Sequence, residues 1–302
     1  MDDYPGYLRG LADGTLQQAA KALMAELEDC VVCPHHCHVN RKAGELGYCQ
    51  SGWNVEIGGY EPHFGEEPPL VGTYGSGTIF FSHCNLGCLF CQNWDISHEK
   101  GDKLSPEDLA SIMLELQQAG CHNINLVSPS HYVPQIIAAV LHAAEKGLHI
   151  PLVYNTSGYD NKTTLERIDG IVDIYMPDFK YASSEIGKQL SCVSSYWKVT
   201  KAAVKEMHRQ VGDLVIDEQG IAHRGLLIRH LVLPGNLAGT EQVMEFIAKE
   251  VSPTSYINIM DQYFPEFKAQ QNPKLNRCIT RAEFLQAVDA AKRASPFFRL
   301  IH

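Results

Sequence analysis

The sequence lacks any long apolar run and any block of positive charge. No apolar stretch approaches the roughly 20 residues that a helix needs to cross a bilayer, so we expect no association with a membrane. Runs of lysine and arginine never exceed two residues, and the formal net charge is −10. Because duplex nucleic acid is bound through concentrated positive charge, we also expect no nucleic-acid partner.

The opening residues, MDDYPGYLRG, lack the apolar segment of a signal peptide, so we expect a cytoplasmic protein. What the chain does have is cysteine. It has ten, and seven of them lie between Cys30 and Cys91. In a reducing cytosol, clustered cysteines indicate metal or redox chemistry rather than structural disulfides.

The pattern along the chain predicts two parts. Residues 1–71 form an N-terminal extension, with an amphipathic helix over 15–29, a cysteine-rich segment, and a loop-rich stretch over 51–77. Residues 72–302 form the core, in which six predicted strands alternate with helices. The strands are expected at 78–82, 123–127, 151–155, 172–176, 226–233 and 256–260. The helices are expected at 105–119, 133–146, 163–168, 194–210, 241–251 and 280–294, and a hairpin at 214–224.

This alternation predicts an α/β fold with a parallel sheet. Periodicity leaves open whether the sheet is an open doubly wound one or a partial (β/α)6 barrel. In both folds the ligands bind at the carboxyl ends of the strands. The polar residues that follow each strand are therefore the candidates for the site.

Three cysteines come directly after the first strand of the series. Cys84, Cys88 and Cys91 have the spacing C-x3-C-x2-C, and soft thiolates select iron–sulfur clusters or zinc. Three thiolates can bind three irons of a cubane and leave the fourth iron open. Zinc would need a fourth protein ligand, which His83 or His98 could supply.

The run CNLGCLFC resembles the cysteine motif of the radical S-adenosylmethionine superfamily, including an aromatic residue, Phe90, before the last cysteine. The resemblance implies a partial (β/α)6 barrel and a [4Fe–4S] cluster at the triad. Its open iron would chelate the amino and carboxylate groups of S-adenosylmethionine. Reduction then releases a 5′-deoxyadenosyl radical, so S-adenosylmethionine and the cluster are the implied cofactors.

The same resemblance suggests roles for residues after the second and third strands. Family members usually carry a Gly-Gly-Glu-like turn after the second strand, where this chain has Ser128, Pro129 and Ser130. Backbone carbonyls and the Ser130 hydroxyl would then meet the methionyl amino group. His131 either faces the substrate or caps the turn. After the third strand, the resemblance makes Asn155 or Ser157 a ribose contact, and a capping turn is the alternative.

Two later segments resemble those of pyruvate formate-lyase activating enzymes. Asp178 and Lys180 alternate with Phe179, so both can point to one side of the strand while Phe179 packs. The resemblance implies that Lys180 contacts the methionyl carboxylate or the adenosine. Arg229 is a charge inside an apolar run and needs an anion. The resemblance makes that anion the methionyl carboxylate, and a structural ion pair is the alternative.

The extension has a second cysteine cluster. Cys30, Cys33, Cys37 and Cys49 predict a closed metal site, with zinc and a second iron–sulfur cluster both open as the occupant. One of the histidines at 35, 36 and 38 could replace a cysteine. The isolated Cys121, Cys192 and Cys278 are expected to be buried small apolar residues.

We therefore expect an oxidoreductase that uses radical chemistry to abstract hydrogen, similar to glycyl-radical-enzyme activases. Its partners would be an electron donor such as flavodoxin or ferredoxin and, in the activase version, a protein substrate. The alternative is a non-catalytic binding protein stapled by zinc.

Overall fold

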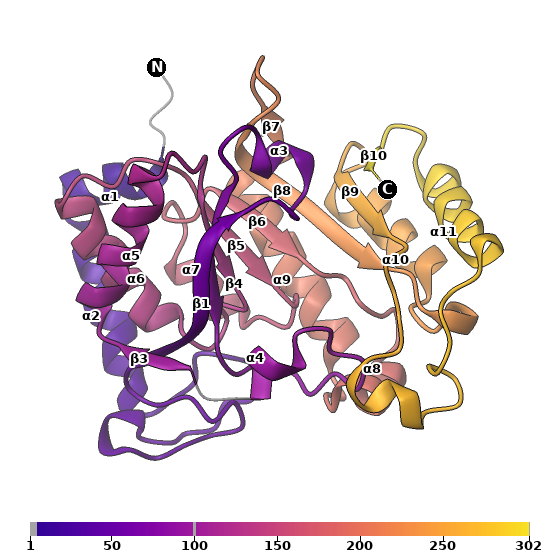
Figure 1. Ribbon diagram of the computed structural model, residues 1–302, viewed down its shortest axis with the longest axis horizontal. Coiled ribbons are helices and arrows are strands. Elements are labelled where there is room, and N and C mark those ends of the chain that lie inside the picture. Colours follow the sequence, from indigo (N-terminus) through magenta and orange to yellow (C-terminus); the bar gives the residue numbers. More distant parts are fainter. Residues whose placement is uncertain (1–4, 99–100, 302) are drawn as a thin grey trace.

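The computed structural model describes residues 5–98 and 101–301. The acidic residues at positions 1–4, on which the expectation about a signal peptide partly depends, lie outside the described residues. The described chain has a mixed α/β architecture, with one sheet at the centre and helices packed around it (Figure 1). None of its helices is long and apolar enough to cross a membrane.

Six strands form the parallel series that the sequence predicts. They are β2 (Ser76–Phe81), β4 (Ile124–Val127), β5 (Leu152–Thr156), β6 (Ile174–Pro177), β8 (Ala222–Leu231) and β9 (Tyr256–Met260). Each pairs in parallel with the next one in the series. The sheet has two separate ends, so among the described strands the barrel does not close. The fold is therefore the predicted partial (β/α)6 barrel.

Four further strands extend this series. They are β1 (Val55–His63), β3 (Asp102–Leu104), β7 (Val215–Ile216) and β10 (Arg299–Ile301). Strand β1 pairs antiparallel with both β2 and β3, β10 pairs in parallel with β9, and β7 forms the predicted hairpin with β8. The prediction of loop over 51–77 was wrong for β1. Gly58 and Gly59 interrupt its pattern at the point where the pairing register shifts, and glycine weakens a strand signal.

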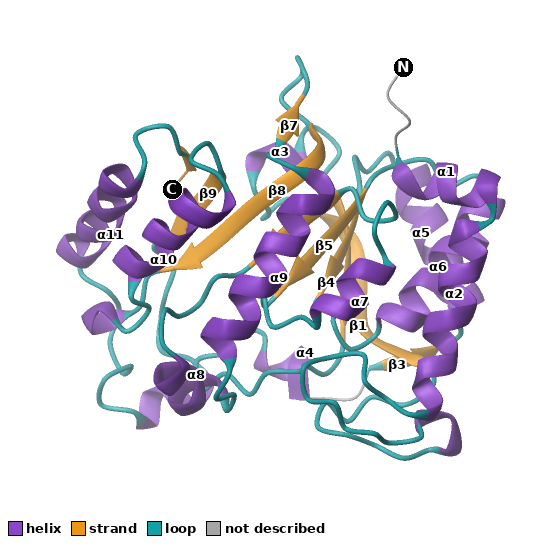
Figure 2. Ribbon diagram, turned by 180° about the vertical axis from the view of Figure 1, so that it is seen from behind, coloured by secondary structure: helices purple, strands orange, loops and turns teal. Residues whose placement is uncertain are grey.

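The helices cover the sheet on its outer side (Figure 2). The longer ones are α1 (Gly6–Asp13), α2 (Thr15–Ala25), α5 (Pro106–Gln118), α6 (Val133–Glu145), α8 (Ser184–Ser191), α9 (Tyr196–Val211) and α11 (Arg281–Ala294). The shorter ones are α3 (Pro68–Val71), α4 (Trp94–His98), α7 (Lys162–Arg167) and α10 (Thr240–Phe246), which continues as a π-helical turn over Ile247–Val251. Short 3-10 turns lie at Glu26–Glu28, Arg41–Ala43, Pro234–Asn236 and Phe267–Gln271.

Local capping explains where two of these helices begin. The Ser105 hydroxyl accepts the backbone N–H of Asp108, whose carboxylate in turn accepts the backbone N–H of Ser105. Thr280 and Glu283 form the same reciprocal box at the start of α11. Each box satisfies donors that the first helical turn leaves free.

The N-terminal helices share a hydrophobic core with the sheet. Leu16 and Leu23 of α2 are fully buried in the same cluster as residues of α6, and α2 packs directly on α6. The Tyr7 hydroxyl donates to the carbonyl of Ile150, and the Gly6 N–H donates to Asp173. Whether the boundary near residue 71 separates two domains stays a prediction.

The isolated cysteines differ from one another. Cys121, in the connection between α5 and β4, is buried, as predicted. The prediction was wrong for Cys192 and Cys278, which are both exposed. Cys192 ends α8 in the left-handed conformation, and its thiol faces the carbonyl of Gly87 at 3.6 Å.

Candidate functional site

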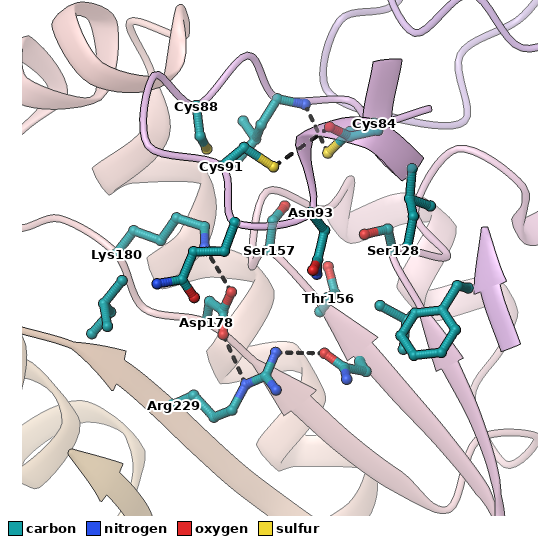
Figure 3. Close-up of a pocket in the computed structure, with 18 of the residues that line it drawn as sticks. Cys84, Cys88, Cys91, Asn93, Ser128, Thr156, Ser157, Asp178, Lys180 and Arg229 are labelled. Atoms are coloured by element: carbon teal, nitrogen blue, oxygen red, sulfur yellow. Dashed lines mark hydrogen bonds and ion pairs between the residues drawn. The ribbon is translucent and has the colours of Figure 1, made fainter. Parts of the chain in front are cut away.

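The carboxyl ends of the parallel strands meet at one edge of the sheet, where a cavity of about 260 Å³ opens among them. Nine of the predicted site residues and cluster ligands line it together with Phe90: Cys84, Cys88, Cys91, Ser128, Asn155, Ser157, Asp178, Lys180 and Arg229. Figure 3 shows the cysteine loop on one side of this cavity and the Asp178, Lys180 and Arg229 side chains on the other. Residues from five strand ends and the cysteine loop therefore converge on one space.

The cysteine loop runs from the end of β2 toward α4, and each of its three thiols has a neighbour that fixes it. The backbone N–H of Leu86 donates to the Sγ of Cys84 at 3.4 Å. The Oγ of Ser191, at the end of α8, lies 2.9 Å from the Sγ of Cys88. The Oγ of Ser97 lies 3.5 Å from the Sγ of Cys91. The loop thus presents its sulfurs to the cavity with polar support behind them.

Burial makes two thiols of this loop, those of Cys84 and Cys88, weaker acids than a free cysteine. Burial raises the pKa of Cys84 to about 12. Burial also raises the pKa of Cys88, to about 11. The rise is smaller than that of Cys84 because the nearby Lys180 ammonium offsets part of the effect of burial. Metal binding requires the thiolate, so loading of the site releases protons.

The donor set of the triad fits an iron–sulfur cluster better than a single zinc ion. In a cubane each thiolate binds a different iron, so the sulfurs need not converge on one point. The two histidines that could complete a zinc site have other partners. His83 contacts Glu56 at 3.3 Å, and His98 contacts Ser97 at 2.8 Å.

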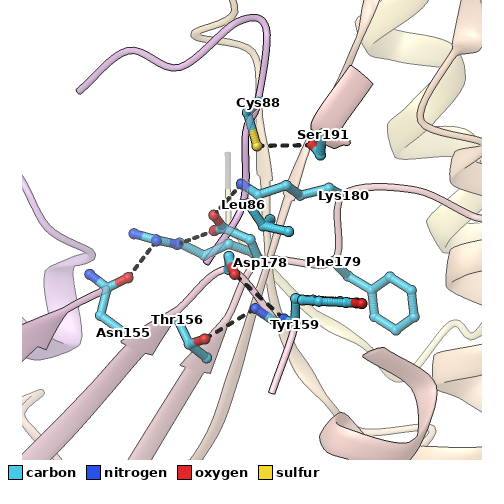
Figure 4. Close-up of polar contacts among 12 residues, drawn as sticks. Leu86, Cys88, Asn155, Thr156, Tyr159, Asp178, Phe179, Lys180 and Ser191 are labelled. Atoms are coloured by element: carbon cyan, nitrogen blue, oxygen red, sulfur yellow. Dashed lines mark hydrogen bonds and ion pairs between the residues drawn. The ribbon is translucent and has the colours of Figure 1, made fainter. Parts of the chain in front are cut away.

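Beneath the triad, an acid holds two cations. Oδ2 of Asp178 lies 2.6 Å from the Nζ of Lys180, and Oδ1 accepts from the Nε of Arg229 at 2.8 Å (Figure 4). Burial alone would raise the pKa of Asp178, but Arg229 and Lys180 outweigh it and lower this pKa. As predicted, Phe179 points the other way and is fully buried.

Arg229 sits in an ion pair of the chain's own side chains. Its Nη2 donates to Oδ1 of Asn155 at 2.6 Å, and its Nη1 lies 3.6 Å from Glu66. Burial raises the pKa of Glu66, and Arg229 acts against that rise. The structural ion pair that the sequence left open is therefore present, and a contact between Arg229 and S-adenosylmethionine stays a prediction.

The serine turn after β4 divides into two parts. Ser128 lines the cavity and has a left-handed backbone, with φ of 61°. Among the described residues that line the cavity, Ser130 is absent. The residue is 4% exposed, and its hydroxyl donates to Oδ1 of Asp160 at 2.6 Å. The Ser130 side chain is thus a poor candidate for the methionyl amino group, because the buried carboxylate of Asp160 already accepts its hydrogen bond.

His131 also turns away from the cavity. It is buried, and its Nε2 donates to the carbonyl of Ser82 at 3.0 Å. Of the two alternatives for His131, these contacts do not support a side chain that faces the substrate, because the turn that aims Ser128 into the cavity directs His131 toward the extension.

The extension's four cysteines also come together. Cys30, Cys33, Cys37 and Cys49 line one small cavity, at some distance along the chain from the triad. The neighbouring histidines have other contacts: His35 stacks on Tyr48, and His38 contacts Asp29 at 2.9 Å.

Two functional neighbours were missed by sequence reasoning. Ser191 stands on α8, a helix that the sequence analysis did not predict, and Glu66 comes from a loop far from every cysteine. Neither has a spacing signal. Gln92 and Asn93, by contrast, follow Cys91 directly and line the cavity, so their position after the motif would have found them.

Comparison with known proteins relates the chain to two archaeal sequences. The uncharacterized protein MJ0674 of Methanocaldococcus jannaschii is 33% identical over 278 residues, which cover 88% of this chain and 75% of that protein. The uncharacterized protein MJ0808 of the same organism is 26% identical over 157 residues, or 46% of each chain.

A solved structure and a family model complete the comparison. The crystal structure of HydG, a maturase of the [FeFe]-hydrogenase, aligns with a TM-score of 0.48 at 12% identity, over 72% of this chain and about half (49%) of the HydG chain. The model of the Radical SAM superfamily matches residues 78–247, which include the triad and the strand ends up to β8. The chain therefore belongs to the Radical SAM superfamily.

Proposed function

We propose that this protein reductively cleaves S-adenosylmethionine to a 5′-deoxyadenosyl radical, which then abstracts a hydrogen atom from a substrate. The observation that carries the proposal is the cavity at the strand ends. Three cysteine thiols and the polar side chains of Ser128, Asn155 and Lys180 line it together. An electron-transfer protein would need no such pocket beside its cluster.

The chain's own residues supply a cluster site with one open position. Cys84, Cys88 and Cys91 offer three thiolates, and the nearby His83 and His98 contact Glu56 and Ser97. When bound, a [4Fe–4S] cluster with an open iron supplies the electron that breaks the sulfonium bond. Backbone and hydroxyl donors at Leu86 and Ser191 would stabilise the negative charge on the ligating sulfurs.

Lys180 provides the positive charge on the opposite wall of the cavity. Burial alone would lower its pKa, but Asp178 outweighs this effect and raises it, so Lys180 stays protonated at neutral pH. Its ammonium is positioned to bind a carboxylate, and Asp178 orients it by a 2.6 Å hydrogen bond. The buried ring of Phe90 helps to keep water out of the cavity.

For the substrate, we propose an activase-like role in which a glycine of a partner protein loses hydrogen. The support is the likeness of the segments around Asp178 and Arg229 to those of pyruvate formate-lyase activating enzymes. In this role the electron comes from flavodoxin or ferredoxin.

The test is anaerobic reconstitution with iron and sulfide, followed by dithionite and S-adenosylmethionine. We expect about four irons per triad, a brown protein, and 5′-deoxyadenosine in the product mixture. A triple variant with Cys84→Ala, Cys88→Ala and Cys91→Ala should lose both iron and product. The matched control replaces the exposed Cys192 and Cys278 by alanine and should keep them.

Two results would overturn the proposal. One is a fully clustered protein that forms no 5′-deoxyadenosine. The other is a colourless zinc protein that folds normally and does not bind S-adenosylmethionine, which is the outcome expected of a zinc-stapled binding protein.

A further inference from the structure

The four cysteines of the extension surround a second, closed cavity. Cys30, Cys33, Cys37 and Cys49 line it together with Arg41 and His131. In Figure 1 this part of the chain forms the violet loops below α2. Two hydrogen bonds hold the backbone around this cavity. The N–H of Cys30 donates to the carbonyl of Val39, and the N–H of Tyr48 donates to the Sγ of Cys37 at 3.4 Å.

A glycine lets the chain pass close to one of these sulfurs. A Cβ atom at Gly47 would lie 2.8 Å from the Sγ of Cys37, which is closer than real contacts allow. Glycine at this position therefore lets the backbone wrap around the thiol, as in loops that carry metal-binding cysteines. The close approach is a property of the folded loop and not of the sequence spacing alone.

Arg41 is a buried cation without a matching anion. Its side chain is 1% exposed. Its Nε donates to the carbonyl of Gly52 and its Nη1 to the carbonyl of His131, at 2.9 and 2.8 Å. Its Nη2 has no hydrogen-bond partner, and no carboxylate among the described residues forms an ion pair with it. A charge in this position is very costly unless something negative lies beside it.

The four thiols are the groups that can provide this negative charge. Buried cysteines without a metal are neutral and do little to compensate a cation. A divalent ion held by four thiolates carries a net charge of −2, and its sulfurs accept hydrogen bonds. An occupied site would therefore explain both the burial of Arg41 and its free Nη2.

The size of the cavity limits what can occupy it. Its volume is about 10 Å³, which is about the space of one water molecule. The cavity beside the triad is about 260 Å³. The smaller space matches a single ion, after modest side-chain rotation, more closely than the eight atoms of a cubane core. Rotation is needed because no three of these ligands stand at coordinating positions in the described chain.

We propose that Cys30, Cys33, Cys37 and Cys49 bind one tetrahedral divalent ion of the zinc class, and that Arg41 donates from Nη2 to the ligating thiolates. Arg41 is a positioning residue for the ion and not a ligand. Through the carbonyl of His131, whose ring holds the carbonyl of Ser82 just before the triad, the site ties the extension to the loop that carries the other three cysteines.

The first experiment measures metal on the full chain purified without reconstitution. We expect about one zinc per chain, kept in the triple triad variant and lost in Cys33→Ser and Cys37→Ser. Exchange for Co²⁺ should give the intense visible bands of tetrahedral thiolate-bound cobalt. Because the triad variant cannot support radical chemistry, this result is independent of the proposed function.

The second experiment compares the zinc affinities of variants at Arg41 and at its neighbour Lys42. Arg41→Met should weaken zinc binding by about 10- to 100-fold in competition with a chromophoric chelator, as second-sphere substitutions do. Arg41→Lys should restore part of the loss. The control is Lys42→Met, which removes an exposed cation paired with Glu28 and should leave zinc affinity unchanged.

Three outcomes would overturn the proposal: a chain with no bound metal, an iron–sulfur absorption spectrum in the triad variant, or equal zinc affinity in Arg41→Met and Lys42→Met. If Arg41→Met does not fold, the cobalt spectrum of the unaltered chain still decides between a single tetrahedral ion and a cluster.

Discussion

The carboxylate of Asp178 binds the ammonium of Lys180 with one oxygen and the guanidinium of Arg229 with the other. One buried acid thus organises two cations that come from neighbouring strand ends. Of the two cations, Lys180 is near enough to the cysteine loop to lower the pKa of Cys88, and Arg229 contacts Asn155 and Glu66. This division predicts different consequences for the two cations.

Replacing Lys180 should affect the cofactor more than the fold. Lys180→Met removes the cation that faces the cavity but leaves Asp178 paired with Arg229. We expect the Kd for S-adenosylmethionine to rise by about 10- to 100-fold, the value of a lost charged hydrogen bond. Titration calorimetry on the reconstituted protein measures it, and Lys188→Met, on an exposed position of α8, is the control. An unchanged Kd would remove Lys180 from the binding site.

Replacing Arg229 should affect the fold first. Arg229→Met leaves Asp178 and Glu66 with less compensation in a buried setting, and breaking such a pair costs about 3–5 kcal/mol. Urea denaturation measures the loss. Arg224→Met, on the same strand but exposed, should cost far less. If Arg229 is instead needed only by the cofactor, the free energy of unfolding without S-adenosylmethionine will not change.

Substitutions of the two serines after β4 should also differ, one in its effect on stability and the other in its effect on cofactor binding. Ser130→Ala removes a donor from the buried carboxylate of Asp160 and should cost about 1–3 kcal/mol of stability. Affinity for S-adenosylmethionine should stay unchanged. Ser128→Ala is the matched variant, since its side chain lines the cavity, and it should weaken binding with little loss of stability. The reverse pattern would contradict the arrangement of this turn.

Ser191 should tune the reduction potential. Hydrogen bonds to ligating sulfurs stabilise the reduced, more negative cluster and raise its potential. Ser191→Ala removes the hydroxyl 2.9 Å from the Sγ of Cys88, so the potential should become more negative in an EPR-monitored redox titration. Ser194→Ala, an exposed serine a few residues later, is the control. A potential equal to that of the control would show that this hydroxyl does not reach the cluster.

Asp173 predicts a pH dependence of stability. It accepts the backbone N–H groups of Gly6 and Leu152, yet burial raises its pKa to about 7. The folded state therefore holds this proton more tightly than the unfolded state. The contribution of this protonated carboxyl to the free energy of unfolding is therefore complete below about pH 4 and is lost as the pH rises through about 7. The total loss is up to about 4 kcal/mol.

The check is the difference in unfolding free energy between pH 4.5 and pH 8. Asp173→Asn should flatten this part of the profile, and the exposed Asp289→Asn should keep it. A profile that rises with pH in the unaltered chain and falls in Asp173→Asn would contradict the sign.

The parallel series of strands was predictable because its signals are local. Apolar runs such as PLVY and helix starts such as that at Ser105 depend only on neighbouring residues. Strand β1 was not predictable, because Gly58 and Gly59 hide its alternation and its pairing with β2 is a tertiary contact. The burial pattern of an edge strand is visible only after its partner is in place.

For the site, too, features with a local sequence signal were predictable, and features that depend on tertiary contacts were not. Cysteine spacing and the rule of strand ends placed the triad, Asn155 and Lys180 around one cavity. The directions of side chains within a turn could not be foreseen, so the sequence did not separate Ser128, which lines the cavity, from Ser130 and His131, whose side chains contact Asp160 and Ser82. Arg229 is an intermediate case: its need for an anion was clear from the sequence, but its partner Asp178 is 51 positions away and becomes its neighbour only when β6 and β8 pair.

The hydrogen bond from Tyr7 to the carbonyl of Ile150 joins residues 143 positions apart. During synthesis, the first helix therefore leaves the ribosome long before its partner exists. Its apolar face, with the buried Leu16 and Leu23 of the next helix, must wait until α6 has emerged. The loop that carries the four N-terminal cysteines is in the same position, because its Arg41 donates to the carbonyl of His131 and can do so only after almost half of the chain has been made.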